Sequence, residues 1–357
     1  MDKRALLIVT GILLTAISSL SVVLLCRISM PLFEKIYRII IARKKELFCI
    51  TAIYPVGSIA LIRADFMYRD DMGRVLHGYS ILGGFSRYLA EIISNTLHTS
   101  GYLADISPLP QLVALLIVGL AGIMIIDILQ DKDKFNPLSV ISLIPIGLSP
   151  FFLMCLSYKY DSVDMGFSIL FATLPIVFTN KNKLKYIVLV VLCTIAVCTS
   201  YQAASGIFPV LITFMALIMW KNKDDNKSIL SLIVTSAFGY IFGMLYFRLI
   251  LMDTYSSEEN YVDTGVNVSN TNLIENIIYN LKAFIKYTAD EMKPIWIAFI
   301  IIAIISFVFS VVSQTKRSKS VTCLIAVISL VLMYFMSFGA YVIINEPLIK
   351  GRCLYTL

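Results

Sequence analysis

Long apolar stretches recur along the whole chain, and they constrain its fold more than any other feature. Their expected boundaries are 5–25, 47–62, 110–129, 138–156, 166–178, 186–199, 204–220, 229–251, 294–312 and 321–343. A helix needs about 20 mostly apolar residues to cross the hydrocarbon core of a bilayer, with a range of about 17–25. Several stretches are short by that measure, so the ends of some spans, or one whole span, stay open. The pattern predicts a polytopic membrane protein.

Composition and backbone chemistry indicate the same class. Apolar residues make up 58% of the 357 residues, charged residues make up 15%, and the mean hydropathy is +0.83. A soluble domain of this size has no interior large enough to hide so much apolar surface. Backbone groups in lipid must bond within the protein, and these stretches are too long and too evenly apolar for barrel strands. We therefore expect an all-α fold in which residues 1–357 form one transmembrane domain of about ten helices.

Lysine and arginine are distributed unevenly between alternate loops. The richer set holds 17 of them in 52 residues and comprises 26–46, 130–137, 179–185, 221–228 and 313–320. The poorer set holds 10 in 116 residues and comprises 63–109, 157–165, 200–203, 252–293 and 344–357. Cytoplasmic loops carry the excess of positive charge, so the loops 63–109 and 252–293 are expected on the other side of the membrane. The net charge of +7 then reflects membrane topology, not nucleic acid binding.

The amino-terminal segment 1–46 allows two orientations. The alternation of loops places the amino terminus outside, yet Lys3 and Arg4 precede the first apolar stretch, which would suit a signal-anchor entering from the cytoplasm. Under the second reading the basic segment 31–44 lies flat on the membrane as an amphipathic helix. The later loops keep their sides under both readings.

The positions of most cysteines are typical of a membrane bundle, and the sequence shows no nucleotide-binding motif. Six of the seven cysteines lie in or beside apolar stretches, and we interpret them as small packing residues without a disulfide or metal role. The sequence has no glycine-rich nucleotide loop, so a free nucleotide sugar or ATP has no visible site. No cofactor and no metal are expected, because the spacing of His77 and His98 matches no metal motif.

The adjacent carboxylates Asp70 and Asp71 are the strongest candidates for chemistry. They lie in the loop 63–109, just outside a hydrophobic stretch, and Arg74 follows one helical turn later. Two like charges in contact cannot both ionise easily, so one pKa is expected to rise. A carboxylate beside a cation such as Arg74 stays charged and can accept a proton from a sugar hydroxyl. The alternative is that both aspartates cap the helix that follows, since Asp favours that position.

Other polar residues gather near the same membrane boundary. Apolar spacing predicts a surface helix over 79–97, in which Arg87 and Glu91 share a face, and a second amphipathic helix over 272–291. Arg248 lies near the outer end of an apolar stretch. It is either a ligand for a lipid phosphate or a side chain that extends to the interface.

Four short motifs resemble the Gtr family of bacterial membrane glucosyltransferases. They are Asp70-Asp71-x-x-Arg74-x-x-x-Gly78-Tyr79, Ser86-Arg87-x-Leu89, Asp105-x-Ser107-Pro108-Leu109-x-Gln111 and Ser200-Tyr201-Gln202. The resemblance covers 65–111 best. It implies a GT-C-like bundle with extracytoplasmic surface helices and a polyprenyl-phosphate-linked glucose donor. The chain departs from the family at Tyr88, where members have proline. Family chains also continue beyond the position of Leu357, so a carboxyl-terminal truncation is expected.

These features together predict a glycosyltransferase of the bacterial inner membrane, with an active site that faces the periplasm or cell exterior. The sugar, expected to be glucose, would pass from polyprenyl phosphate to a surface polysaccharide such as O-antigen, in functional partnership with a donor synthase and a flippase. The expected site residues are catalytic Asp70 and Asp71 and substrate-binding Arg74, Arg87, Asp105, Tyr201, Gln202 and Arg248. A lipid-linked saccharide flippase or transporter, a polysaccharide polymerase and a structural or immunity-type membrane protein remain alternatives.

Overall fold

The part of the chain that the structure describes contains helices and connecting segments, and no strands. A computed structural model describes residues 31–78, 82, 86–129, 135–179, 182–252, 273–343, 349 and 351–353. The expected stretch 5–25 lies outside these residues, as does most of the first half of the loop 252–293.

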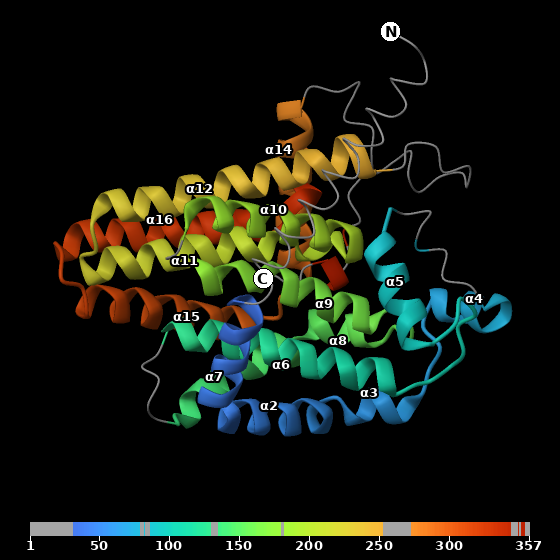
Figure 1. Cartoon of the computed structure of the whole chain (residues 1–357). Helices are drawn as coiled ribbons and strands as arrows, with labels where there is room; N and C mark the ends of the chain where they lie inside the picture. The colour runs from blue at the N-terminus through green and yellow to red at the C-terminus, as the bar shows by residue number, and fades with distance from the viewer. Residues whose placement is uncertain are drawn as a thin grey trace, which may run out of the picture.

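The helices follow one another with short connections (Figure 1). Residues 31–42 are helical and precede α2. The elements are α2 Lys44–Gly57, α3 Ile59–Ala64, α4 Asp70–His77, α5 Tyr88–Leu97, α6 Leu109–Leu129, α7 Pro137–Leu148, α8 Pro150–Leu156, α9 Ser162–Thr173, η2 Leu174–Phe178, α10 Lys183–Ser200, η3 Gln202–Gly206, α11 Ile207–Asn222, α12 Asn226–Tyr246, η4 Phe247–Leu251, α14 Leu273–Glu291, α15 Pro294–Ser313, α16 Lys319–Ser337, η5 Gly339–Val342 and η6 Gly351–Cys353.

Polar caps mark where several apolar helices begin. The Asn136 side chain accepts from the N–H of Leu138 at the start of α7, and Asn182 does the same for Leu184 at the start of α10, both at 3.0 Å. Ser149 accepts from the N–H of Phe152 at the start of α8. A side-chain oxygen at these positions satisfies an N–H that has no partner within the helix, so it fixes the point at which each helix starts.

Six described helices are long and apolar enough to cross a membrane. They are Leu109–Leu129, Lys183–Ser200, Gln202–Asn222, Asn226–Leu251, Pro294–Ser313 and Lys319–Ser337. The expected span 138–156 is instead the pair α7 and α8, bent by 56° at Ser149, and it raises the count to seven if the pair is one span. Expected spans 47–62 and 166–178 correspond to the shorter helices α2, with α3, and α9. The structure therefore confirms a helical membrane bundle but does not confirm the count of ten.

Small residues bring the central helices close together. Gly239 and Gly243 are one turn apart on α12, and a Cβ at Gly239 would lie 2.9 Å from the Val190 side chain on α10. A Cβ at Gly243 would lie 2.8 Å from the Thr194 side chain on the same helix. Such small residues allow two helix backbones to pack closely where lipid offers no hydrophobic driving force.

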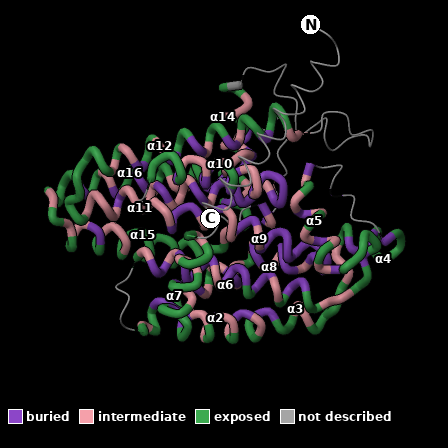
Figure 2. The backbone as a smooth tube through the Cα atoms, viewed as in Figure 1, coloured by how far each residue is buried: buried purple, intermediate pink, exposed green. Residues whose placement is uncertain are grey.

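Burial follows the arrangement expected in a bilayer (Figure 2). The helix α6 is the most enclosed candidate span, with 61% of its apolar window buried, whereas α15 has 6% buried. Large apolar side chains of α12, α15 and α16 are exposed along their outer faces. An apolar surface of this extent suits lipid and would be a liability in water. The six described cysteines are free thiols, and four of them are buried.

The short helices α4 and α5 lie together at one end of the bundle, which we call the site end (Figure 1). The surface helix expected over 79–97 is observed as α5 over Tyr88–Leu97, and most of 79–85 lies outside the described residues. The amphipathic helix expected over 272–291 is confirmed as α14. Helices α6 and α9 pack against each other within the bundle.

Candidate active site

The two adjacent aspartates lie in the first turn of α4, in different environments. Asp70 is exposed, whereas Asp71 is fully buried. Neither caps α4: the N-cap position is Arg69, and no side-chain cap bond is formed there. Gly78 ends the helix in the left-handed region at φ 70°, where a Cβ would meet the Tyr102 ring. Neither aspartate therefore occupies the N-cap position, and both lie in the first turn of α4.

Backbone donors from two segments hold the Asp71 carboxylate. Its Oδ2 accepts from the N–H of Tyr68 at 3.0 Å and from the N–H of Lys159 at 3.1 Å. Its Oδ1 is buried and has no hydrogen-bond partner in the described part of the chain. Burial raises the pKa of Asp71. The backbone N–H groups of Lys159, Tyr68 and Tyr160 and the charge of Arg74 oppose that shift without cancelling it. The leading cause is thus burial, not the expected repulsion from Asp70.

Arg74 connects α4 to the turn that precedes α9. Its guanidinium is buried and forms an ion pair with Asp161, which is also buried. The guanidinium carbon lies 6.0 Å from the centre of the Tyr160 ring, and that ring stacks on His98 at 5.8 Å. The interaction positions the cation one helical turn from Asp71, as the sequence predicted.

Lys159 joins three chain segments at the same place. Its ammonium group contacts Asp65 at 2.6 Å and Asp105 at 2.8 Å, and its backbone N–H binds Asp71. Burial alone would lower the pKa of Lys159, but hydrogen bonds to Asp105 and Asp65 outweigh it and the pKa is raised. Desolvation likewise opposes ionisation of Asp105, yet the bond from Lys159 leaves the pKa of Asp105 below its ordinary value. Asp105, a predicted substrate-binding residue, is therefore engaged by a lysine in this structure.

A further buried carboxylate, Asp164, lies in the first turn of α9. Its side chain is buried, and within the described residues neither of its oxygens has a hydrogen-bond partner. The charges of Arg74 and Arg87 act on it across the site. A buried carboxylate without hydrogen-bond donors is costly, so this group is either balanced by those cations or bonded by a ligand.

Arginines meet aromatic rings on the other side of the cluster. The Arg87 guanidinium lies 5.2 Å from the centre of the Tyr201 ring, and that of Arg352 lies 4.7 Å from the centre of the Tyr158 ring. Arg352 also donates to the Tyr158 hydroxyl, and its carbonyl oxygen accepts from the Tyr201 hydroxyl at 3.4 Å. The Tyr158 ring packs edge-on against Tyr68, whose N–H binds Asp71. The arginines therefore connect to the carboxylates through tyrosines.

Apart from the exposed Asp70, the predicted site residues fall into three groups: a network around Asp71, the Arg87–Tyr201 pair, and two residues outside both. Asp71, Arg74 and Asp105 share one network, and Arg87 stacks on Tyr201 beside it. Gln202 follows Tyr201 in the chain and begins η3, whereas Arg248 is exposed in η4 at the end of α12.

Sequence reasoning missed Lys159, Asp161, Asp164 and Arg352. The available signal for the first three was three charged residues within the loop 157–165 of a chain otherwise poor in charge. In the described part of the chain, no three His, Cys, Asp or Glu side chains cluster in a way that could hold a metal ion.

This arrangement has the parts needed for group transfer from a phosphate. Asp71 offers a carboxylate oxygen without a hydrogen-bond partner among the described residues, and its raised pKa makes it a stronger base than an exposed aspartate. Two arginines lie beyond the neighbouring tyrosines. Arginine presents a forked set of donors that matches phosphate oxygens, and tyrosine rings offer flat apolar faces beside them.

A comparison with protein-family models assigns most of the chain to one family. The model of the family described as Glucosyl transferase GtrII matches residues 59–356. An uncharacterized 55.3 kDa protein encoded in the region 5′ of gtrB in Salmonella phage P22 is 26% identical over 230 residues. That match covers 64% of this chain and 47% of the phage protein, so the chain spans about half the length of the curated relative it matches. No solved structure matches the chain.

Proposed function

The chain belongs to the GtrII family of glucosyl transferases, and from this premise we propose that it moves glucose from polyprenyl phosphate to a cell-surface polysaccharide such as O-antigen. One observation carries the catalytic part of the proposal: the Oδ1 atom of Asp71 is buried and has no hydrogen-bond partner among the described residues, on a carboxylate whose pKa is raised. The loop 63–109, which holds Asp71, is then the catalytic loop, and 252–293 is a second extracytoplasmic loop.

The proposed reaction begins with proton transfer to Asp71. Oδ1 accepts the proton of an acceptor hydroxyl while Oδ2 stays bonded to the N–H groups of Tyr68 and Lys159. The acceptor oxygen forms a bond to the anomeric carbon, and the bond from that carbon to the phosphate oxygen breaks. The electron pair leaves with the phosphate, so the anomeric configuration inverts and polyprenyl phosphate is released. A carboxylate with a raised pKa is a stronger base than an ordinary carboxylate, which suits Asp71 to this proton transfer.

Cations around Asp71 suit the leaving group. Arg87 and Arg352 are proposed to bind the donor phosphate as negative charge develops on it, with Tyr201 and Gln202 beside the sugar. Arg74 is held by Asp161, so we assign it the role of orienting Asp71 and lowering the cost of its ionisation. Asp164 is a candidate acceptor for a sugar hydroxyl, because a hydroxyl would satisfy one of its oxygens.

The experiment that tests this function uses the whole chain in lipid nanodiscs with a polyprenyl-phosphate glucose donor and the surface polysaccharide as acceptor. We expect transfer with the lipid-linked sugar and none with the nucleotide sugar, because the site is expected to face away from the cytoplasmic nucleotide pool. Turnover with the nucleotide sugar alone would refute the proposal. Growth of the acceptor by whole repeat units, in place of single glucose additions, would identify a polymerase instead.

A transporter of lipid-linked saccharides is the second candidate, and one observation favours it. The pair α7 and α8 is bent by 56° at Ser149, and broken helices are typical of transporters. A second observation argues against a transporter. The charged cluster lies at the site end, around α4, whereas a transporter would need polar groups near the middle of the bilayer. Vesicles reconstituted with the protein should not move the lipid-linked sugar between leaflets faster than protein-free vesicles.

A further inference from the structure

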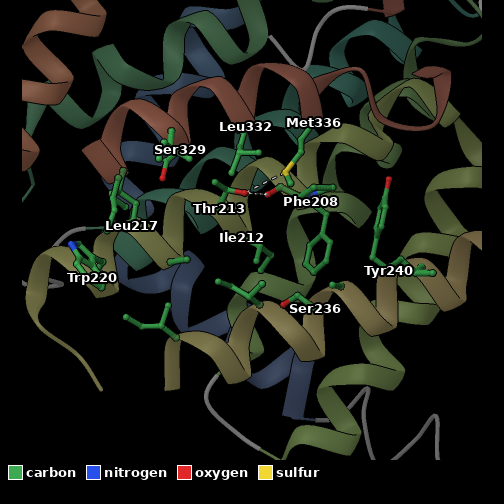
Figure 3. Close-up of a pocket in the computed structure, with 18 of the residues that line it drawn as sticks. Phe208, Ile212, Thr213, Leu217, Trp220, Ser236, Tyr240, Ser329, Leu332 and Met336 are labelled. Atoms are coloured by element: carbon green, nitrogen blue, oxygen red, sulfur yellow. Dashed lines mark hydrogen bonds between the residues drawn. The ribbon is translucent and has the colours of Figure 1, made fainter. Parts of the chain in front are cut away.

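An apolar groove runs between three of the candidate membrane spans. Its volume is about 550 Å³, within the range of about 300–1,000 Å³ that is usual for ligand sites. The groove is lined by one face each of α11, α12 and α16, and Figure 3 shows these side chains pointing into it. Since all three helices qualify as membrane spans, the groove lies at the level of the hydrocarbon layer.

The lining is almost entirely apolar, and several of its few polar groups are bonded within the protein. The Ser236 hydroxyl lies 2.6 Å from the Tyr186 hydroxyl of α10. The Thr213 hydroxyl bonds the carbonyl of Pro209 in its own helix at 2.9 Å and contacts the Met336 sulfur at 3.4 Å (Figure 3). A sugar in this groove would leave its hydroxyl groups without partners, which is costly in an apolar site. The chemistry therefore fits a hydrocarbon chain.

The end of the groove far from the site is occupied by Trp220. Arg317 lies over its indole ring at 4.1 Å. This arginine donates to the carbonyl oxygens of Trp220 and Asp224 and to the Asn226 side chain, at 3.0, 2.6 and 2.8 Å. Its guanidinium is thus bound by protein acceptors, which disfavours a lipid phosphate at this end.

The opposite end of the groove reaches the site end. There Gly339 packs against Ser205, whose carbonyl accepts from the Tyr240 hydroxyl at 3.0 Å. Ser205 belongs to η3, which begins directly after Tyr201, the residue under Arg87. Arg248 lies in η4, directly after α12 and seven residues beyond the groove-lining Ile241, and it is exposed. Positive charge therefore lies at this end of an apolar groove.

We propose that this groove binds the isoprenoid chain of the lipid-linked donor, with the phosphate at Arg248 and the arginines beyond Tyr201. The inference rests on the proposed function, because it takes the donor to be a polyprenyl phosphate. A chain inserted from the bilayer would lie along α11, and its charged end would emerge beside η3 and Tyr201. The fold then delivers the phosphate to the carboxylate cluster while the hydrocarbon stays in a hydrocarbon environment.

The test is photolabelling of the whole chain in nanodiscs with a polyprenyl phosphate that carries a diazirine on its isoprenoid chain. We expect labelled peptides from α11, α12 and α16. Ala237→Trp on α12 and Ser329→Trp on α16 place an indole in the groove, and each should lower labelling about tenfold, equivalent to about 1.4 kcal/mol. Phe238→Trp and Leu324→Trp, on exposed faces of the same helices, should keep wild-type labelling.

Three results would overturn the assignment. They are labelling centred on α15 or other helices, unchanged labelling in both groove variants, and displacement of the probe by ordinary phospholipid as readily as by unlabelled polyprenyl phosphate. If neither groove variant folds by size-exclusion chromatography, the map of labelled residues in the wild-type chain decides the matter.

The labelling needs no catalysis, so its failure is distinct from failure of the proposed function. Labelling in the groove without glucose transfer would support the binding site and refute the proposed activity. Glucose transfer without labelling in the groove would support the activity and refute the binding site.

Discussion

Replacing Asp71 with asparagine separates catalysis from structure, because the structure gives the two carboxylate oxygens different tasks. Asparagine can keep one oxygen at the Oδ2 position, where it accepts from the N–H groups of Tyr68 and Lys159. Its NH₂ group then takes the Oδ1 position and cannot accept a proton. Since general base catalysis contributes about 10²–10⁴-fold, we expect Asp71→Asn to lower the transfer rate by about that factor.

The structural cost of the same substitution is modest. The new NH₂ group meets no acceptor in the described part of the chain at the Oδ1 position, and a buried donor left unsatisfied costs about 1–3 kcal/mol. The substitution also removes a buried charge whose ionisation burial disfavours, which offsets part of that cost. The melting temperature in nanodiscs should therefore change little, while transfer from the lipid-linked donor is nearly lost. Asp70→Asn is the matched control, because Asp70 is exposed and is expected to keep most of the activity.

The pH dependence gives an independent check on this assignment. A base must be deprotonated, so the transfer rate should fall as pH falls through the raised pKa of Asp71, at a higher pH than an ordinary carboxyl at about 3.9 would give. The stability has the opposite slope. A carboxyl whose pKa is raised on folding stabilises the fold below its unfolded pKa, and this contribution is lost as pH rises through the folded pKa. Asp71→Asn should abolish that loss. Near-normal transfer by Asp71→Asn would show that the carboxylate is structural and would refute the mechanism.

Three further predictions concern the network and the topology. Asp161→Asn or Arg74→Gln removes one partner of the buried pair and should lower the free energy of unfolding by about 3–5 kcal/mol. In thermal unfolding, the double variant should lose less than the sum of the two single losses. Additive losses would show that the pair is uncoupled. In Lys159→Met, the Asp105 carboxylate loses its ammonium partner. The wild-type protein should lose stability as pH falls through the lowered pKa of Asp105, and the variant should lose less. Unfolding measured between about pH 5 and pH 2 checks this. In a background without native cysteines, Ser100→Cys should react with an impermeant reagent in intact cells and Lys183→Cys should not; the reverse would invert the topology and the catalytic assignment.

The helices were predictable because the apolar pattern fixes them, but their breaks were not. The stretch 138–156 is continuous in hydropathy, yet Ser149 caps a new helix with Pro150 in its first turn. A Ser-Pro pair inside an apolar run was the available signal. The stretch 47–62 similarly divides at Ser58 into α2 and α3. Hydropathy averages over a window, so it does not register the one or two residues at which a helix ends.

Only part of the candidate site could be predicted from the sequence. Asp70, Asp71 and Arg74 are neighbours in the chain, and helical spacing alone places Asp71 near Arg74. Their partners Lys159 and Asp161 are far away in sequence and meet α4 only because α6 and α9 pack side by side, with Gly166 against Ala114. One sequence without an alignment carries no signal for such a contact. The different environments of Asp70 and Asp71 are also a property of the fold, since the two residues are chemically identical.

The orientation of Asp71 depends on the loop 157–165, in which no site residue was predicted from the sequence. One donor to Oδ2 comes from Tyr68, next to α4, and the other from Lys159, whose side chain is fixed by Asp65 and Asp105. Because Oδ2 is held from both segments, the direction of the unpartnered Oδ1 is set by how the turn before α9 docks on α4. The same turn supplies Asp161 to Arg74. The proposed base and its cation are therefore oriented by one short segment, so changes there should alter the transfer rate even where they touch no substrate.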